Sequence, residues 1–208
     1  MELFSAVCAS HNQWDLYNVP LIESFRKWEP SAPLVMVDSG SYPHYPDPTD
    51  KSYTIVRTDN ESHCKAINLG LLHAPVSEWY LTLDNDTLIT GKIGDELKKL
   101  EKGAVYGAEV RHWRFGNYAV GWCFAIPRRV MLTVGLYDEN YIKILYEETD
   151  YCYRALQHGF GVCKAPLPVT HINGGGGSRQ YIDSNELTWI NLSYFLQKYR
   201  LRWELNVK

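Results

Sequence analysis

The chain has 208 residues, a formal net charge of -3 and a high aromatic content, with seven Trp and fifteen Tyr. This length suits one domain with a full hydrophobic core, and the balanced charge argues against a strongly basic surface for nucleic acid or an anionic membrane. No apolar run approaches the roughly 18 residues of a membrane span, and no basic flank precedes an apolar signal core. We therefore expect no integral membrane segment and a cytoplasmic location.

The cysteines agree with that location. They are odd in number and include no Cys-x-x-Cys pair, which argues against a disulfide framework and against a zinc site. We expect reduced and mostly buried thiols at Cys8, Cys64, Cys123, Cys152 and Cys163.

The first ninety residues predict the order strand, helix, strand, strand, helix, strand. Residues 2–9 are apolar on both faces, which is typical of a central parallel strand, and residues 15–28 carry apolar side chains at helical spacing. Ligands bind beyond the carboxyl ends of strands in such sheets, so Asn12 and Asp38 should lie on the functional edge. The remaining elements expected here are strands at 34–37, 53–56 and 79–83 and a helix at 62–74.

The strand at 79–83 runs directly into Asp84-Asn85-Asp86. Two carboxylates at the edge of a core are costly unless their charge is compensated. A divalent cation with oxygen ligands would compensate it, and phosphate oxygens can complete its shell. The alternative for so short a pattern is a strand end followed by an Asp-rich turn.

The second half of the chain predicts further helices and strands without a break. Residues 111–115, Arg-His-Trp-Arg-Phe, form an aromatic and basic patch that is too small to indicate DNA binding. Because no repeat or linker marks a second domain, we expect residues 1–208 to form one α/β domain. The elements expected in this half are helices at 94–102, 128–132, 151–157 and 186–202 and strands at 104–109, 119–126 and 168–170.

A second acidic cluster, Glu147-Glu148-Thr149-Asp150, precedes the helix at 151–157. One interpretation is a helix start, where each carboxylate gains roughly 0.3–1 kcal/mol from the helix dipole and Asp150 pairs with Arg154. This interpretation explains Asp150 better than Glu147 and Glu148. The other interpretation is that a carboxylate here acts as a general base, with its pKa raised by the neighbouring acids.

His171 follows the expected strand at 168–170 and precedes four glycines at 174–177. Metal ligation by a neutral imidazole is one role for it, and an ordinary surface or core histidine is the alternative. The glycines lack the Lys-Ser/Thr of a phosphate-binding P-loop. They form either a loop that closes over a ligand, with Arg179 reaching a phosphate, or a plain connection.

The combination of these motifs resembles glycosyltransferase family 2, whose members have the GT-A fold. The resemblance runs nearly from end to end, with the family's motifs in the same order and at similar spacing. The sequence departs from the family's pattern at three places. No Asp follows the Asp38-Ser39-Gly40-Ser41 turn, and residues 60–64, Asn-Glu-Ser-His-Cys, replace the Gly-rich turn ahead of the helix that contains Asn68. A Glu stands at position 148 where many relatives carry Asp. The matching segments are 6–12, 35–41, 66–70, 84–86, 134–139, 147–154, 159–160, 169–171 and 194–199.

The resemblance implies a mixed, mostly parallel central sheet flanked by helices. It also implies a metal-dependent, inverting glycosyltransferase that uses a nucleotide-diphosphate sugar, and we expect this donor to be UDP-linked. Residues 1–90 would bind the donor, and residues 91–208 would supply the catalytic base and the acceptor side. The alternative is a catalytically inactive sugar- or nucleotide-binding domain of the same fold. The acceptor hydroxyl, on a glycan, a lipid-linked sugar, a protein or a modified nucleic-acid base, and the oligomeric state are left open.

The resemblance also implies a role for individual residues. Glu148 would be the base, with Glu147 and Asp150 as alternatives. The metal, Mn²⁺ or Mg²⁺, would bind Asp86 and Asp84, with His171 as a further ligand. Residues expected to contact the nucleotide sugar are Asn12, Asp38, Asn68, Asp84 and Arg179, and those expected on the acceptor side are Trp113, Trp122 and Asp138.

Overall fold

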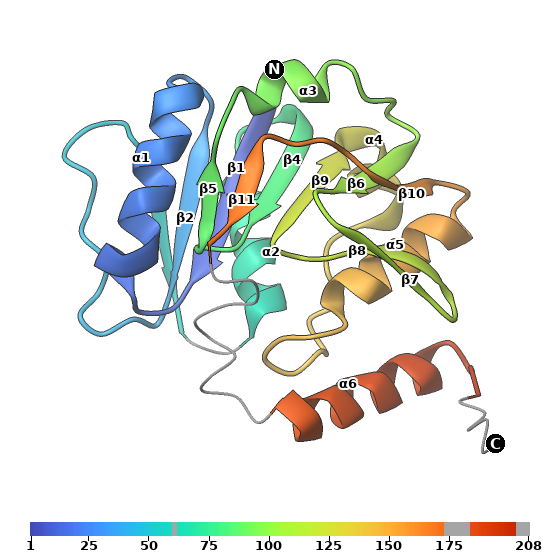
Figure 1. The fold of residues 1–208 in the computed structure, drawn as a ribbon. Helices are drawn as coiled ribbons and strands as arrows, with labels where there is room; N and C mark the ends of the chain where they lie inside the picture. Colours follow the sequence, from blue (N-terminus) through green and yellow to red (C-terminus); the bar gives the residue numbers. More distant parts are fainter. Residues whose placement is uncertain (60–61, 173–183, 203–208) are drawn as a thin grey trace.

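The computed structural model describes residues 1–59, 62–172 and 184–202 of the chain. These residues form a mixed seven-stranded sheet with helices on both faces, as expected from the sequence (Figure 1). Within this sheet β9 runs antiparallel to both of its neighbours, and the other six strands share one direction. In sheet order the strands are β10 (Gly161–Lys164), β6 (Ala104–Gly107), β9 (Cys123–Pro127), β4 (Ser77–Leu83), β1 (Glu2–Ser10), β2 (Leu34–Ser39) and β3 (Thr54–Thr58).

The helices bury both faces of the sheet, which is why the central strands are apolar throughout. In β1, Phe4, Ala6 and Cys8 pack toward one layer, while Val7 and Ala9 pack toward the other. The first layer contains α1 (Val19–Trp28) and α3 (Ile93–Leu97). The second contains α2 (His63–His73), α4 (Arg128–Val134), α5 (Glu147–Gln157) and α6 (Ser184–Lys198).

Helix α2 packs unusually close to the sheet because Gly70 faces it. A Cβ atom at Gly70 would overlap Val7 and would lie 2.9 Å from Cγ2 of Val37. The side chain of Ser62 caps the helix by accepting a hydrogen bond from the backbone N–H of Lys65, at 3.3 Å. This close packing holds α2 against β1 and β2.

Two small antiparallel pairs complete the fold. β5 (Thr87–Ile89) pairs with β11 (Val169–His171), which places His171 opposite Thr87, directly after the Asp-x-Asp turn. β7 (Val110–Trp113) and β8 (Gly116–Ala119) form a hairpin. The prediction of an aromatic and basic patch between strands was therefore wrong in its local structure, because Val110 to Trp113 is itself a strand.

Several other boundaries differ from the sequence prediction. The first helix begins as a π-helical turn, η1 (Trp14–Asn18), and strands β5 and β10 were not predicted. Helix α3 ends at Leu97 rather than 102, and α6 ends at Lys198 rather than 202. Helix α5 begins at Glu147, so the second acidic cluster is the first turn of the helix rather than the segment before it.

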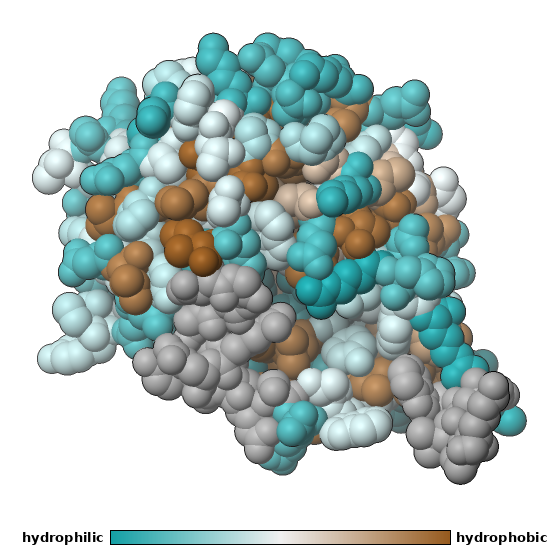
Figure 2. All heavy atoms as spheres, in the orientation of Figure 1, coloured by the Kyte–Doolittle hydropathy of each residue, from teal (hydrophilic) through white to brown (hydrophobic). Residues whose placement is uncertain are grey.

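The surface and the thiols agree with the composition. Hydrophilic and hydrophobic side chains are interspersed on the face drawn in Figure 2. The cysteines are unpaired and buried except for Cys163, which is exposed. None of the helices in the described ranges has the length and apolar character needed to cross a membrane.

Candidate active site

A cavity of about 940 Å³ opens at the carboxyl ends of β1 and β4. It receives side chains from both halves of the chain, and its lining includes both acidic clusters that the sequence singles out. Its walls are the loop after β1 (9–13), the turn after β4 (84–86), the start of α2 (62–66), the segment from β8 to β9 (118–122), the loop into α5 (143–149), His171 of β11 and Thr188 of α6.

The first cluster is Asp84, Asp86 and His171. Asp86 is 1% exposed, and its Oδ1 lies 2.9 Å from Nε2 of His171. The backbone N–H of Ile172 donates to the carbonyl of Asp86 at 2.9 Å, so β11 and the turn are held together. The His171 ring stacks on Trp122, with centroids 5.0 Å apart and ring planes 2° from parallel. The imidazole is therefore fixed beside the carboxylates.

This cluster has the composition expected of a cation site. Each of the three residues offers a ligand atom, and these atoms lie within 4.8 Å of one another. Among the residues that the structure describes, the second oxygen of Asp86, Oδ2, is buried without a hydrogen-bond partner. Burial raises the pKa of Asp84; the charge of His63 opposes this effect, and repulsion from Asp86 adds to it. A bound cation would satisfy the orphaned oxygen and offset the repulsion, so the residues fit a divalent metal.

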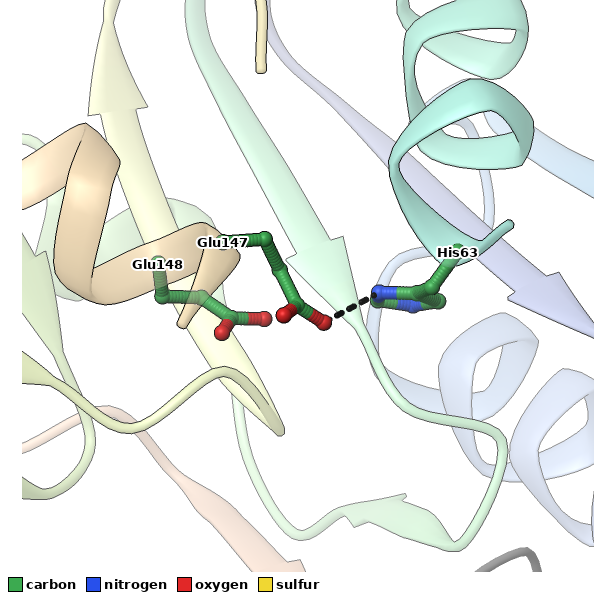
Figure 3. A group of neighbouring side chains, drawn as sticks. All are labelled: His63, Glu147 and Glu148. Atoms are coloured by element: carbon green, nitrogen blue, oxygen red, sulfur yellow. Dashed lines mark hydrogen bonds and ion pairs between the residues drawn. The ribbon is translucent and has the colours of Figure 1, made fainter. Parts of the chain in front are cut away.

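The second cluster is His63, Glu147 and Glu148, whose side chains lie close together (Figure 3) and line the same cavity. Nδ1 of His63 is 3.2 Å from Oε1 of Glu147, and the other Glu147 oxygen is buried with no hydrogen-bond partner in the described part of the chain. Burial acts to lower the pKa of His63, but the hydrogen bond and charge of Glu147 outweigh it and raise that pKa to about 9. Burial and the charge of Glu147 raise the pKa of Glu148 well above its usual value.

The loop that leads into α5 is held in an uncommon backbone conformation. Lys143, Leu145 and Tyr146 have φ values of 58°, 85° and 73°, in the left-handed region that non-glycine residues rarely adopt. Asn191 of α6, which is fully buried, holds this loop. Its Nδ2 donates to the carbonyls of residues 142, 144 and 145 at 2.9–3.0 Å, and its Oδ1 accepts from the N–H of residue 142 at 3.1 Å. Helix α6 thus fixes the path of the chain just before Glu147.

Most of the residues singled out from the sequence line the cavity. Trp113 and Trp122 lie on its second-half wall, and Asn12 lies at the end of β1, where its Oδ1 accepts a hydrogen bond from the N–H of Tyr42 at 3.0 Å. Arg179 lies outside the described residues. Among the described residues, those singled out from the sequence that line the cavity are Asn12, Asp84, Asp86, Trp113, Trp122, Glu147, Glu148 and His171.

Two of the residues expected at the donor side are buried behind the cavity wall. Asp38 is fully buried and accepts hydrogen bonds from the backbone N–H groups of Ser41 and Tyr45 at 2.9 and 3.0 Å. It therefore shapes the loop beside Asn12. The amide of Asn68 exchanges hydrogen bonds of 2.9 Å with the backbone N–H and C=O of Tyr137, which ties α2 to the chain after α4.

Asp150 and Asp138 connect α5 and α6 and do not line the cavity. Asp150 is fully buried, with Arg154 donating to Oδ2 at 2.8 Å and Lys198, Tyr199 and Tyr141 donating to Oδ1. Asp138 accepts hydrogen bonds from Lys198 at 2.6 Å and from the hydroxyl of Tyr194 at 2.9 Å. Both carboxylates are occupied by structural contacts.

Sequence patterns did not indicate the parts played by His63 and Asn191, or that Gly121 lies against the carboxylate of Glu148. A single histidine after Ser62 has no pattern around it, and the partner of His63 lies 84 residues away. Asn191 occupies what looks like an ordinary polar position in a long helix, although it is buried. For Gly121 the only signal was a glycine between expected strand residues, which can indicate a close approach of other groups.

No protein-family model and no curated protein sequence matches the chain. Solved structures that resemble most of it include the following three. GalNAc-T7 with UDP, GalNAc and Mn²⁺ matches 90% of this chain and 47% of its own, with 16% identity and a TM-score of 0.66. The mannosyltransferase PcManGT from Pyrobaculum calidifontis, with GDP-Man and Mn²⁺, matches 98% of this chain and 66% of its own, with 14% identity and a TM-score of 0.69. TarS from S. aureus matches 94% of this chain and 40% of its own, with 14% identity and a TM-score of 0.61.

The chain has the GT-A fold. The central sheet and its flanking helices agree with these neighbours, although the chain spans about half the length of GalNAc-T7. At 14–16% identity the likeness establishes the fold alone.

Proposed function

We propose that this GT-A protein is a metal-dependent inverting glycosyltransferase of the family 2 type, which transfers a sugar from a nucleotide-diphosphate donor, UDP-linked, to an acceptor hydroxyl. The observation that carries the proposal is that the two clusters, Asp84–Asp86–His171 and His63–Glu147–Glu148, line one cavity. The neighbours GalNAc-T7 and PcManGT, solved with UDP or GDP-Man and Mn²⁺, support it.

On the donor side, Asp84, Asp86 and His171 would hold Mn²⁺ or Mg²⁺. When bound, the cation offsets the negative charge that develops on the diphosphate leaving group. Asn12 and the loop that Asp38 shapes lie beside this cluster at the end of β1 and β2, where the nucleoside would bind. Asn68 would act on the donor side indirectly, by holding α2 in place. The contact of Arg179 with the nucleotide sugar stays a prediction.

On the acceptor side, Glu148 would act as the general base. It accepts the proton of the acceptor hydroxyl while that oxygen attacks the anomeric carbon, and the bond to the diphosphate breaks with its electron pair leaving on the diphosphate. One displacement inverts the anomeric configuration, so no nucleophilic carboxylate is needed. The raised pKa of Glu148, caused by burial and by Glu147, makes its carboxylate a stronger base than an exposed glutamate.

The acceptor would lie against the second-half wall of the cavity. Trp113 and Trp122 line that wall and offer aromatic faces on which a sugar ring can stack. Trp122 is already stacked on His171, so an acceptor at Trp122 would lie next to the cation ligands. These aromatic faces suit an acceptor hydroxyl on a glycan. Direct assays with glycan, lipid-linked sugar, protein and nucleic-acid acceptors would distinguish the acceptor classes.

The test is turnover of a panel of UDP-glucose, UDP-galactose, UDP-GalNAc, UDP-GlcNAc and GDP-mannose with Mn²⁺, measured as release of nucleoside diphosphate. Asp86→Asn and Glu148→Gln should each reduce the rate by about 10²-fold or more, because each removes a group of the reacting centre. Glu186→Gln, an exposed glutamate at the start of α6, is the matched control and should leave the rate unchanged.

Two outcomes would contradict the proposal. Near wild-type turnover by Glu148→Gln would remove this residue as the base and leave Glu147 as the next candidate. Tight binding of UDP with Mn²⁺ but no turnover of any donor, with or without added sugar acceptors, would favour the non-catalytic binding domain.

A further inference from the structure

We propose that His63 and Gly121 are positioning residues that give the two adjacent glutamates different roles. His63 holds Glu147 in a fixed contact, and Gly121 leaves the space in which the carboxylate of Glu148 lies at the cavity. The inference rests on the proposed function, because it explains why Glu148 rather than Glu147 would be the base.

The contact between His63 and Glu147 is rigid at both ends. The backbone N–H of His63 donates to the carbonyl of Lys143 at 2.8 Å, and Ser62 caps the same helix start. Glu147 is 3% exposed and lies in the first turn of α5, directly after the loop held by Asn191. With Oε1 at His63 and Oε2 buried, Glu147 has little freedom to reach an acceptor hydroxyl.

Gly121 is required for space rather than for backbone conformation. Its φ does not lie in the left-handed region, unlike the φ of Gly116, so a side chain would not strain the backbone there. A Cβ atom at Gly121 would, however, overlap the carboxylate of Glu148 and lie 3.0 Å from its Cγ. The carboxylate of Glu148 thus rests directly on the backbone of Gly121.

The segment that carries Gly121 also holds the Asp-x-Asp turn. The carbonyl of Trp122 accepts hydrogen bonds from the backbone N–H of Asp84 and from Oγ1 of Thr87, both at 3.0 Å. On the other side of Gly121, the N–H of Val120 donates to the carbonyl of Glu109 at 3.0 Å. One short, hydrogen-bonded segment therefore sets the separation between Glu148 and the candidate cation ligands.

A methyl group at residue 121 must displace the carboxylate of Glu148, because the two cannot occupy the same space. We expect Gly121→Ala to lower kcat by about 10²-fold or more, the contribution of a general base, measured with the fastest donor of the panel. The dissociation constant for UDP with Mn²⁺, from calorimetry, should stay within about twofold of wild type. Gly103→Ala is the matched control, since no atom of the described residues lies within 4 Å of a Cβ atom there.

A double-mutant cycle tests whether Gly121 acts through Glu148. Aspartate is one methylene shorter, so Glu148→Asp withdraws the carboxylate from the space that the new methyl group would fill. The Gly121→Ala change should therefore cost less than about 10-fold in the Glu148→Asp background. An equal loss in both backgrounds would overturn the proposed role of Gly121.

Two variants, one conservative and one disruptive, test the positioning role of His63. His63→Gln keeps a hydrogen-bond donor for Glu147 and should retain more kcat than His63→Leu, which removes it, with UDP and Mn²⁺ affinity unchanged in both. Equal kcat for wild type, His63→Gln and His63→Leu would overturn the role of His63.

Crystal structures supply a readout that needs no activity. In Gly121→Ala the carboxylate of Glu148 should have moved while Glu147 still contacts His63, and in His63→Leu Glu147 should have moved. Unmoved glutamates would overturn the inference. The failures are distinguishable: an active Glu148→Gln contradicts the proposed function, whereas an inactive Glu148→Gln with a fully active Gly121→Ala contradicts the positioning role alone.

Discussion

Glu147 and Glu148 are neighbours in the chain but differ in their surroundings. Glu147 contacts His63 at 3.2 Å, while Glu148 rests on the backbone of Gly121. Burial and the adjacent Glu147 raise the pKa of Glu148, and the positive charge of His63 acts in the opposite direction. The protonation of the proposed base is therefore set by these two neighbours as well as by burial.

The pH dependence of kcat/KM should report this balance. A base must be deprotonated, so a raised pKa for Glu148 moves the loss of activity on acidification to a higher pH than an ordinary glutamate would give. Removing the charge of His63 should raise the pKa of Glu148 further. In the pH profile of kcat/KM, the loss of activity on acidification should therefore occur at a higher pH in His63→Gln than in the wild type. If this loss of activity in His63→Gln occurred at the same pH as in the wild type, or at a lower pH, the stated electrostatic role of His63 would be contradicted.

Single residues could be predicted from sequence only where a pattern surrounded them. Asp84, Asp86, Glu148 and His171 stand in recognisable motifs, and the structure brings them into one cavity. His63 and Gly121 had no such pattern, because their significance lies in contacts with residues far along the chain. Asp38, expected to contact the nucleotide, is satisfied by its own loop, which a sequence motif cannot reveal.

Helices α5 and α6 are joined through the buried carboxylate of Asp150. Its hydrogen bonds from Arg154 and Lys198 place one negative and two positive groups in a largely dry interior. Such a group stabilises the fold only while all its partners are present, because an unpaired buried charge is costly. This arrangement assigns Asp150 to the packing of the two helices rather than to the cavity.

Removal of this carboxylate should destabilise the protein strongly. We expect Asp150→Ala to lower the free energy of unfolding by about 3–5 kcal/mol, since it leaves Arg154 and Lys198 without their shared partner. Asp95→Ala is the control: its pair with Lys98 is more than half exposed on both sides and should contribute about 1 kcal/mol or less. Urea denaturation compares them, and an equal effect of the two substitutions would contradict the account.

At the level of elements, the sequence predicted what hydrophobic periodicity can specify. Strands β1, β2 and β4 and helices α2 and α4 lie within a few residues of their expected bounds. The hairpin β7–β8 was missed because its half-exposed, aromatic and basic residues do not alternate clearly. Strand β5 was not predicted, because it is held by pairing with β11, which depends on the tertiary fold rather than on its own sequence.

The whole molecule places the proposed chemistry between the two halves of the chain. The turn after β4 and the start of α2 belong to the first ninety residues, whereas the segment 118–122, the loop 143–149 and His171 belong to the second part. The α/β class and the mixed, mostly parallel sheet followed from the order of predicted elements and from the resemblance. The antiparallel position of β9 did not, because strand direction in the second half depends on long-range contacts.

The central claim, that a cation site and a base share one cavity, is tested most directly by a crystal structure of the protein with UDP and Mn²⁺, using anomalous scattering from manganese. We expect an anomalous peak at Asp84, Asp86 and His171, with the diphosphate beside it and Glu148 facing the same cavity, and no such peak in Asp86→Asn. A manganese peak at His63, Glu147 and Glu148 instead, or UDP bound outside this cavity, would contradict the account.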